Sequence, residues 1–189
     1  MENNIKIYVD LDGTVADFET GFKRLTKGLS TEDYKRRILN YLNVDLKYPQ
    51  RLAYQAFDQL FWDKCGTDVS FWANLPLMPG TMKLWNYIEK YNPIVLTATT
   101  SGKKYQQKVQ TGKIEWVRKY FGNNIKVLFV ELDSSNYLID TKSIYCSGEN
   151  DILIDDRETY IKGWNKKGGV GILHISARET IKKLKKLGI

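Results

Sequence analysis

Five short apolar runs along the chain predict the strands of a β-sheet. They lie at 5–9 (IKIYV), 93–98 (PIVLTA), 125–130 (IKVLFV), 151–155 (DILID) and 169–175 (GVGILHI). Each run has the length of a strand, is rich in β-branched residues and is separated from the next by helical or loop sequence. Runs that are apolar almost throughout are typical of parallel strands covered on both faces. The pattern therefore predicts an α/β fold with a doubly wound, Rossmann-like parallel sheet.

Apolar residues at helical spacing predict helices between the later strands. In the segment 81–91, Leu84 and Ile88 fall on one face, and the segment 112–121 presents Trp116 in the same way. These helices alternate with the strands, as the doubly wound arrangement requires.

The alternation breaks off between the first strand and residue 76. This stretch contains no strong strand pattern, and its apolar spacing predicts helices at 18–27, 31–42 and 49–64. We therefore expect a core of residues 1–17 and 76–189, with a small helical cap subdomain inserted at 18–75. In open α/β sheets, ligands bind beyond the carboxyl ends of the strands, so this insert would form a roof over the site.

Length, composition and net charge are compatible with many classes of globular protein. A chain of 189 residues is long enough for one well-packed domain, and its aromatic content of 13% provides large side chains for a core and a pocket. The net charge of +7 favours anionic partners, without distinguishing nucleotides from polymers. Much of this charge lies at 181–189 (IKKLKKLGI), which on a helix gives a solvated basic face.

Cysteine count and hydropathy exclude several classes. The two cysteines, Cys65 and Cys146, can form neither a disulfide framework nor a zinc site, and neither lies in a CxxC motif. No apolar run is long enough for a membrane span or follows a basic amino-terminal segment. We expect a cytoplasmic protein without a membrane partner.

Carboxylates follow two of the predicted strands. Asp10 and Asp12 come directly after the first strand, and Asp155 and Asp156 end the fourth, while Thr97 lies near the end of the second. The carboxyl ends of parallel strands meet at one edge of a sheet, so these four aspartates would repel each other unless a cation lies between them. Mg²⁺ is the cation that best fits a set of carboxylate oxygens.

These motifs carry a family resemblance. DLDGT after an apolar run, a strand ending in Thr97, a lysine at a helix start, and ILIDD resemble the haloacid dehalogenase-like (HAD) phosphohydrolase superfamily, in an order that covers the whole chain. Within it, DLDGTVADFE, LPLMPG, KIEWVRKYFG and DILIDDR resemble the 5'(3')-deoxyribonucleotidase family, including its bacterial and viral relatives. The resemblance implies a HAD-type core and phosphoryl transfer at the aspartates.

The resemblance also implies a role for each aspartate. Asp10 would be the nucleophile that forms an aspartyl phosphate, and Asp12 the general acid and then the general base. Asp156, with Asp155 beside it, would hold Mg²⁺ together with Asp10 and the main-chain carbonyl of Asp12. The residues alone leave open which of Asp155 and Asp156 contacts the ion.

Phosphate binding is assigned in the same way. Thr97, the amides of Ala98 and Thr99 and the Thr99 hydroxyl would bind the phosphoryl oxygens. Lys113 would neutralise their charge from a helix amino terminus, and Lys142 in LIDTKS is a rival for that role. The resembling enzymes have a threonine-serine-proline run after the second strand, whereas this chain has TATTSGKK, which leaves open which hydroxyl binds phosphate.

Aromatic residues flank both connections to the insert. In the resembling nucleotidases, residues at the positions of Phe18, Phe71 and Trp72 line the base pocket, although packing between roof and sheet is an equal alternative for Trp72. Arg157 is either a substrate contact or a salt-bridge partner.

Simpler roles are expected for several other residues. We interpret Asp17 as a helix cap and His174 as a structural residue. The cluster of Phe57, Phe61 and Trp62 is interpreted as the core face of a helix. The polar stretch 131–149 is interpreted as a hairpin or flap.

The expected function is that of a magnesium-dependent phosphatase acting on a small nucleotide, with pyrimidine deoxyribonucleoside monophosphates as the finer expectation. The alternatives are a 3'-end phosphatase acting on DNA or RNA, a non-catalytic nucleotide-binding protein and a phosphotransferase. The base and sugar preference, the 5' or 3' position of the phosphate and the oligomeric state, including a dimer, stay open.

Overall fold

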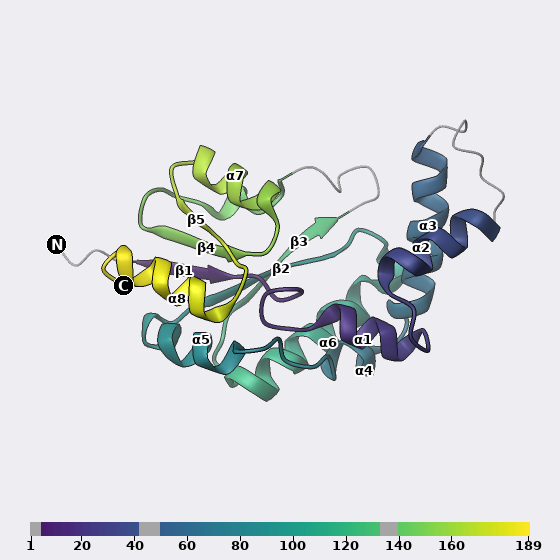
Figure 1. Ribbon diagram of the computed structural model, residues 1–189, viewed down its shortest axis with the longest axis horizontal. Coiled ribbons are helices and arrows are strands. Elements are labelled where there is room, and N and C mark those ends of the chain that lie inside the picture. The colour runs from purple at the N-terminus through teal and green to yellow at the C-terminus, as the bar shows by residue number, and fades with distance from the viewer. Residues whose placement is uncertain (1–4, 42–49, 133–139) are drawn as a thin grey trace.

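The described residues contain one sheet of five parallel strands, which confirms the predicted α/β class. The computed structural model describes residues 5–41, 50–132 and 140–189, with only the backbone described at 50–56. The strands are β1 (Lys6–Val9), β2 (Ile94–Thr100), β3 (Val127–Leu132), β4 (Asp151–Asp155) and β5 (Val170–Leu173). Their order is β3-β2-β1-β4-β5, and every neighbouring pair is parallel (Figure 1).

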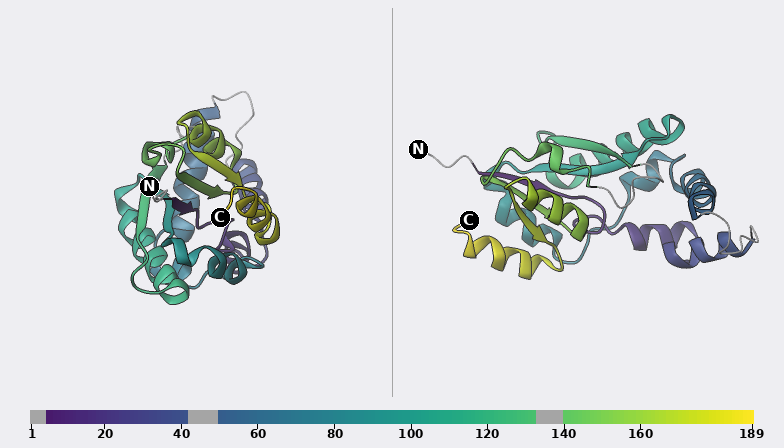
Figure 2. Two further views of the ribbon diagram at one scale, coloured as in Figure 1. Left: turned by 90° about the vertical axis from the view of Figure 1, so that its left-hand side faces the viewer. Right: turned by 90° about the horizontal axis from the view of Figure 1, so that it is seen from above.

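Helices cover both faces of this sheet. The helices that follow the insert are α5 (Thr81–Ile88), α6 (Lys103–Phe121), α7 (Glu158–Lys166) and α8 (Ala177–Lys186). Ile7 and Ile152 point to one face, into the core formed with α5, α6 and α8, whereas Tyr8 and Leu153 point to the other face and pack with α7. Figure 2 shows these two helical layers on opposite sides of the sheet. The doubly wound arrangement is confirmed.

Four helices separate β1 from α5: α1 (Phe18–Leu25), α2 (Thr31–Tyr41), α3 (Gln50–Cys65) and α4 (Val69–Ala73). Figure 1 shows α2 and α3 beyond the end of the sheet toward which the strands point. The chain leaves and returns at adjacent points, because the Asp17 amide donates to the Pro76 carbonyl at 2.7 Å and Ala16 bridges Leu77. The predicted helical stretch is present, and its division into core and cap subdomains stays a prediction.

Some element boundaries differ from those predicted. The helix predicted to start at 112 starts at Lys103, because Tyr105 and Val109 extend its buried face toward the amino terminus. The 81–91 helix ends at Ile88 and continues as a 3₁₀ turn. The short helix α4 was not predicted, and residues 42 and 49, the predicted boundaries of two helices, lie outside the described residues.

Two residues with expected structural roles have them. The Asp17 carboxylate caps α1 by accepting from the Thr20 amide at 2.9 Å. His174 is 7% exposed, its Nδ1 lies 2.9 Å from the Thr180 hydroxyl, and burial lowers its pKa. Among the described helices, none combines the length and apolar character needed to span a membrane.

Candidate active site

Two aspartates lie in the turn that ends β1. Asp10 is buried, and Leu11 between the two aspartates is fully buried, so the chain is anchored while the Asp12 side chain stays 27% exposed. Gly13 has a φ of +81°, and a Cβ there would come within 2.5 Å of an Asp156 oxygen. Only glycine satisfies both requirements, which is why DLDGT can bring β1 and β4 together at this point.

Lys142 lies between two buried carboxylates. Its ammonium donates to Asp10 Oδ1 at 2.5 Å and to Asp155 Oδ2 at 2.6 Å. Burial alone would lower the pKa of Lys142, but the two negative charges outweigh it and raise the pKa. The Asp140 carboxylate accepts from the amides of Lys142 and Ser143, which holds this part of the backbone in place.

The sequence interpretation gave Lys142 too little weight. The lysine comes from the stretch 131–149 that was interpreted as a hairpin or flap, of which 133–139 lie outside the described residues. The part from 140 onward forms a turn and a 3₁₀ helix at Ser143–Tyr145, and it delivers this buried ammonium. The motif LIDTKS held a usable signal, since its Asp140 orients the backbone that carries the lysine.

Lys113 holds the other aspartate. Its ammonium donates to Asp12 Oδ2 at 2.5 Å, to the Ala98 carbonyl at 2.6 Å and to Thr97 Oγ1 at 3.1 Å. The prediction that Lys113 lies at a helix amino terminus was wrong, because α6 begins at Lys103 and Lys113 lies well inside it. The helix dipole therefore adds little at Lys113, whose contribution comes from its own buried charge.

β2 extends beyond β1 at this edge of the sheet. It continues to Thr100, past the predicted end near Thr97, whereas β1 pairs with it only as far as Val95. The amides of Val95 and Ser101 donate toward the β3 side. Because hydrogen bonding alternates from side to side along a strand, the peptide groups of Ala98 face the side where β1 has ended. The Ala98 carbonyl is thus available to Lys113.

Three carboxylates gather at a second point of the site. Oxygens of Asp10, Asp155 and Asp156 lie within 4.8 Å of one another, whereas the Asp12 carboxylate is not part of this cluster. Desolvation by burial raises the pKa of Asp156 to about 7, and the negative charges of Asp10 and Asp155 add to this shift. Burial, opposed by Lys142 and reinforced by Asp10, raises the pKa of Asp155 to about 6. This donor set fits a hard divalent cation such as Mg²⁺.

Asp155 and Asp156 differ in their contacts. Asp155 accepts from Lys142 through Oδ2 and from the Arg157 amide at 2.9 Å through Oδ1, so both of its oxygens are engaged. Asp156 takes part in none of the ion pairs found among residues 5–41, 50–132 and 140–189. Its carboxylate is therefore the more available of the two for a metal ion.

A cavity of about 140 Å³ opens beside these groups. Its walls are formed by Asp10, Asp12, Phe18, Phe61, Trp62, Trp72, Ala98, Thr99, Lys113, Leu132, Arg157 and Tyr160. The buried oxygens Thr99 Oγ1 and Asp12 Oδ1 have no hydrogen-bond partner within the described residues. Because an unpaired buried oxygen is costly, this wall suits a polar ligand that supplies the missing hydrogen bonds.

The aromatic wall differs from the one predicted. Phe71 does not line the cavity and instead packs edge-on against Phe18 and Trp72, with ring centroids 5.8 and 5.1 Å apart. Phe61 and Trp62 pack against the core, as interpreted, and both also line the cavity. Helical spacing assigns them to one face of α3 but does not show that this face meets the carboxyl edge of the sheet.

Tyr160 is a wall residue that the sequence did not indicate. It is almost fully buried, and its ring centroid lies 4.8 Å from the Lys142 ammonium and 4.7 Å from the Arg157 guanidinium carbon. The ring thus packs between these two cations, each within cation–π distance. Burial raises the pKa of its phenol, so the side chain is a neutral part of the wall.

Several solved structures resemble this chain at low sequence identity. A HAD-superfamily hydrolase from Ehrlichia chaffeensis matches with 12% identity over 97% of each chain and a TM-score of 0.53. A HAD-superfamily hydrolase of subfamily IA from Geobacter sulfurreducens matches with 14% identity over 96% of this chain and 97% of that chain, at a TM-score of 0.47. A cytosolic 5'-nucleotidase IIIB bound to cytidine matches with 12% identity over 96% of this chain and 78% of that chain, at a TM-score of 0.39.

No protein-family model and no curated protein sequence matches the chain. The structural likeness to the Ehrlichia protein shows that this chain shares the fold of that protein.

Proposed function

We propose that this chain is a magnesium-dependent phosphomonoesterase that acts on nucleoside monophosphates through an aspartyl-phosphate intermediate, with pyrimidine 5'(3')-deoxyribonucleotides as its substrate class. The observation that carries this proposal is that Asp10 and Asp12, which line one cavity, pair with two different buried lysines. Two carboxylates with separate cationic partners can take separate roles, one as nucleophile and one as proton carrier.

In the first step, an Asp10 oxygen attacks phosphorus. The bond from that oxygen to phosphorus forms as the ester bond breaks, and Asp12 gives its proton to the leaving alkoxide. Burial raises the pKa of Asp12; the charge of Lys113 opposes this shift and the charge of Asp10 adds to it. The raised pKa favours a protonated Asp12 that can give its proton to the leaving group. In the second step, water attacks phosphorus, Asp12 takes a proton from the water, and the Asp10 carboxylate is released.

The phosphoryl oxygens would lie along the exposed end of β2. The unpaired Thr99 hydroxyl is available to donate to an oxygen, and the Ala98 peptide faces the same side. The Lys113 ammonium donates to the Ala98 carbonyl and lines the same cavity as Thr99, and it would neutralise the negative charge that builds up in the transition state.

Asp10, Asp155 and Asp156 would hold the Mg²⁺ ion, with Asp156 contributing the carboxylate that no lysine engages. The bound ion would neutralise phosphoryl charge and reduce repulsion between an anionic substrate and Asp10. Lys142 keeps Asp10 and Asp155 at a fixed separation, which positions the nucleophile.

The size of the cavity and its aromatic wall support a small nucleotide as substrate. At about 140 Å³ the cavity is smaller than pockets that enclose a whole drug-sized ligand, and it suits a phosphoryl group with part of a sugar. The base would extend along Phe18, Trp62 and Trp72, where stacking is worth about 1–3 kcal/mol per base.

The test is phosphate release from a panel of 5' and 3' nucleoside monophosphates and a 3'-phosphorylated oligonucleotide, with and without Mg²⁺. We expect Mg²⁺-dependent turnover of the monophosphates, and Asp10→Asn should lower it by at least about 1000-fold because the nucleophile is lost. The matched control is Glu115→Gln, the same acid-to-amide change at an exposed position of α6, which should leave turnover unchanged.

A second variant tests the two-step mechanism. With p-nitrophenyl phosphate, whose leaving group needs no proton, Asp12→Asn should release about one nitrophenolate per chain in a burst and then stall. Absence of both burst and turnover across the whole panel contradicts the proposal. Turnover confined to the oligonucleotide would replace it with a 3'-end phosphatase, and nucleotide binding without turnover would replace it with a binding protein.

A further inference from the structure

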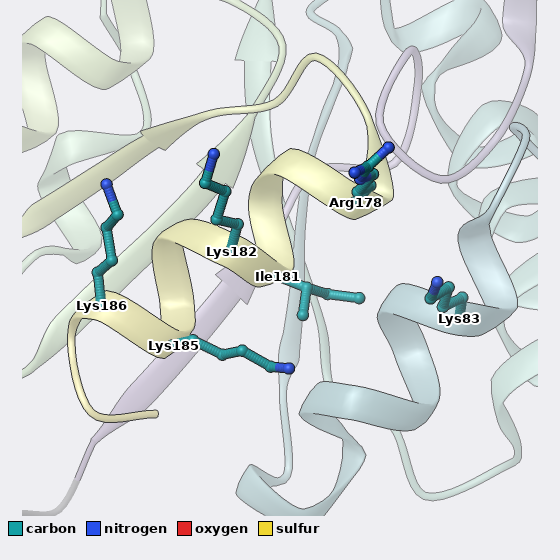
Figure 3. Close-up of a pocket in the computed structure, with 6 residues that line it drawn as sticks. All are labelled: Lys83, Arg178, Ile181, Lys182, Lys185 and Lys186. Atoms are coloured by element: carbon teal, nitrogen blue, oxygen red, sulfur yellow. The ribbon is translucent and has the colours of Figure 1, made fainter.

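A basic groove lies between α5 and α8, outside the candidate active site. It encloses about 470 Å³ and is lined by Lys83, Arg178, Ile181, Lys182, Lys185 and Lys186 (Figure 3). Lys83 comes from α5 and the other lining residues from α8, so cations stand on both walls. The groove shares no lining residue with the cavity that contains Asp10.

Among the described residues, no ion pair neutralises the positive charge of this groove. Its five cationic side chains are exposed, and within the described parts of the chain none of them lies in an ion pair. No acidic residue lines the groove, and the sequence of α5 (TMKLWNYI) has none. The sum is a local field that attracts anions and concentrates them at this face.

The arrangement of the cations fits an extended anion better than a single phosphate. In Figure 3 the amino groups of Lys182, Lys185 and Lys186 are spread along α8 and do not converge on one point. α8 has 10 residues and is therefore about 15 Å long, so its charges can follow several successive phosphates.

The shape and composition of the groove favour nucleic acid over a lipid surface. The apolar side chains of α8, Ile181 and Leu184, are buried in the core. The exposed apolar residues that adjoin lining residues in sequence, Met82 and Leu187, are single side chains on different elements and form no continuous apolar face for a bilayer. A planar membrane would also meet the rim of the groove and not its opposite wall at Lys83. A single strand can enter between two neighbouring helices, whereas a duplex would contact only the exposed side of α8.

We propose that this groove binds the phosphate backbone of single-stranded nucleic acid without sequence preference. No aromatic side chain lines it to stack a base, so the binding is electrostatic and acts on the backbone. The proposal is independent of the proposed phosphatase activity, because the two sites share no residue.

The test is fluorescence anisotropy of a labelled single-stranded oligonucleotide of mixed sequence, with the full chain, across 50–200 mM NaCl. If all five cations contact phosphates, log K should fall against log salt with a slope of about −3.5. The double variant Lys182→Glu, Lys186→Glu should weaken binding by at least about tenfold and make the slope shallower by about 1.4.

The matched control is Lys126→Glu, Lys166→Glu, which changes the net charge equally at exposed positions away from the groove. It should bind much more tightly than the groove variant. Equal weakening in both would mean that the overall charge of +7 attracts the oligonucleotide, and would overturn the proposal. The milder Lys182→Gln, Lys186→Gln variant keeps the test valid if the charge reversal prevents folding.

Two further measurements separate this proposal from its rivals. Asp10→Asn should bind the oligonucleotide as the unmodified protein does; loss of binding would place the strand in the active site and overturn the proposal. Sedimentation with vesicles of phosphatidylcholine and phosphatidylserine should leave most of the protein in the supernatant, at a salt concentration at which the oligonucleotide is bound. Retention on vesicles without oligonucleotide binding would identify a membrane partner instead.

Discussion

At the scale of single residues, charge pairing organises the candidate site. Lys142 has two carboxylate partners and Lys113 has one, and both ammonium groups are almost fully buried. A buried charge without a partner is costly, so each lysine depends on its aspartates as much as they depend on it. The aspartates could be predicted because they follow apolar strands directly, whereas the partners of a lysine depend on how distant segments pack.

Substituting Lys142 tests this dependence. In the absence of divalent metal, Lys142→Met should lower the free energy of unfolding by about 3–5 kcal/mol, because Asp10 and Asp155 lose their shared cation. Addition of Mg²⁺ should restore part of that loss by supplying a replacement charge. Urea unfolding with EDTA or Mg²⁺ measures both effects, with the exposed Lys126→Met as control. Equal stability of the two variants would show that the pairing contributes nothing.

At the scale of elements, α6 connects the site to the insert. It carries Lys113 into the site, buries Trp116 in the core and contacts α4 through Gly112. A Cβ at Gly112 would lie 2.5 Å from both the Trp72 Cβ and the Val69 carbonyl oxygen. Glycine thus allows α4, and with it the aromatic wall, to approach the helix that carries the site lysine.

Gly112→Ala should therefore destabilise the protein, although alanine is normally preferred over glycine inside a helix. Alanine inside a helix is normally better than glycine by about 1 kcal/mol, but here overpacking against α4 should produce a net destabilisation of roughly 1–3 kcal/mol. Displacement of Trp72 should also raise KM for a nucleotide more than for p-nitrophenyl phosphate. Chemical unfolding measures the loss of stability, and steady-state kinetics measures the change in KM. Thr111→Ala, at an exposed position of the same helix, is the control for both. A stabilised variant with unchanged KM would refute the contact.

The start of α6 shows where sequence reasoning failed at this scale. Residues 103–111 (KKYQQKVQT) contain only Tyr105 and Val109 as apolar positions, too few to distinguish a helix from a polar loop. Gly112 then suggested a boundary, although its role is a close approach to α4. The strands were easier to predict, because burial on both faces leaves long apolar runs in the sequence.

At the scale of the whole molecule, the acidic cluster couples stability to pH. The pKa of Asp156 is raised to about 7 and that of Asp155 to about 6, above the ordinary value of 3.8. Between about pH 4 and pH 7 these two carboxyl groups therefore bind more protons in the folded state than in the unfolded state, which lowers stability as pH rises through this window. His174, whose pKa is lowered by burial, opposes this effect with a single group. A cation bound to the cluster favours the ionised carboxylates and reverses that trend.

We expect the protein in EDTA to lose several degrees of melting temperature between pH 5 and pH 8. Saturating Mg²⁺ should raise the melting temperature at pH 8 and have little effect at pH 5, where protons occupy the cluster. Asp156→Asn should flatten the pH dependence in EDTA, since the amide does not titrate. Thermal unfolding followed by circular dichroism measures all three, and a melting temperature in EDTA that rises with pH would contradict the assignment.

The whole fold was predictable in outline, and the aromatic wall of the cavity was not. The parallel sheet and its covering by helices on both faces follow from the apolar runs and the connections between them, as the structure confirms. The contribution of Phe61 and Trp62 to the cavity depends on how α3 is placed over the sheet, and no local pattern records that placement.

The hydrogen bond from Asp17 to Pro76 has a consequence for evolutionary change in this protein. Because the two ends of the intervening segment are joined at one point of the core, lengthening or replacing that segment need not move any strand. The entropy of closing a longer loop grows only slowly, by about 0.6 kcal/mol for each doubling of its length. The sheet with its aspartates can thus stay unchanged while the segment between residues 17 and 76 varies, and under the proposed function new substrates would be acquired by exchanging that segment.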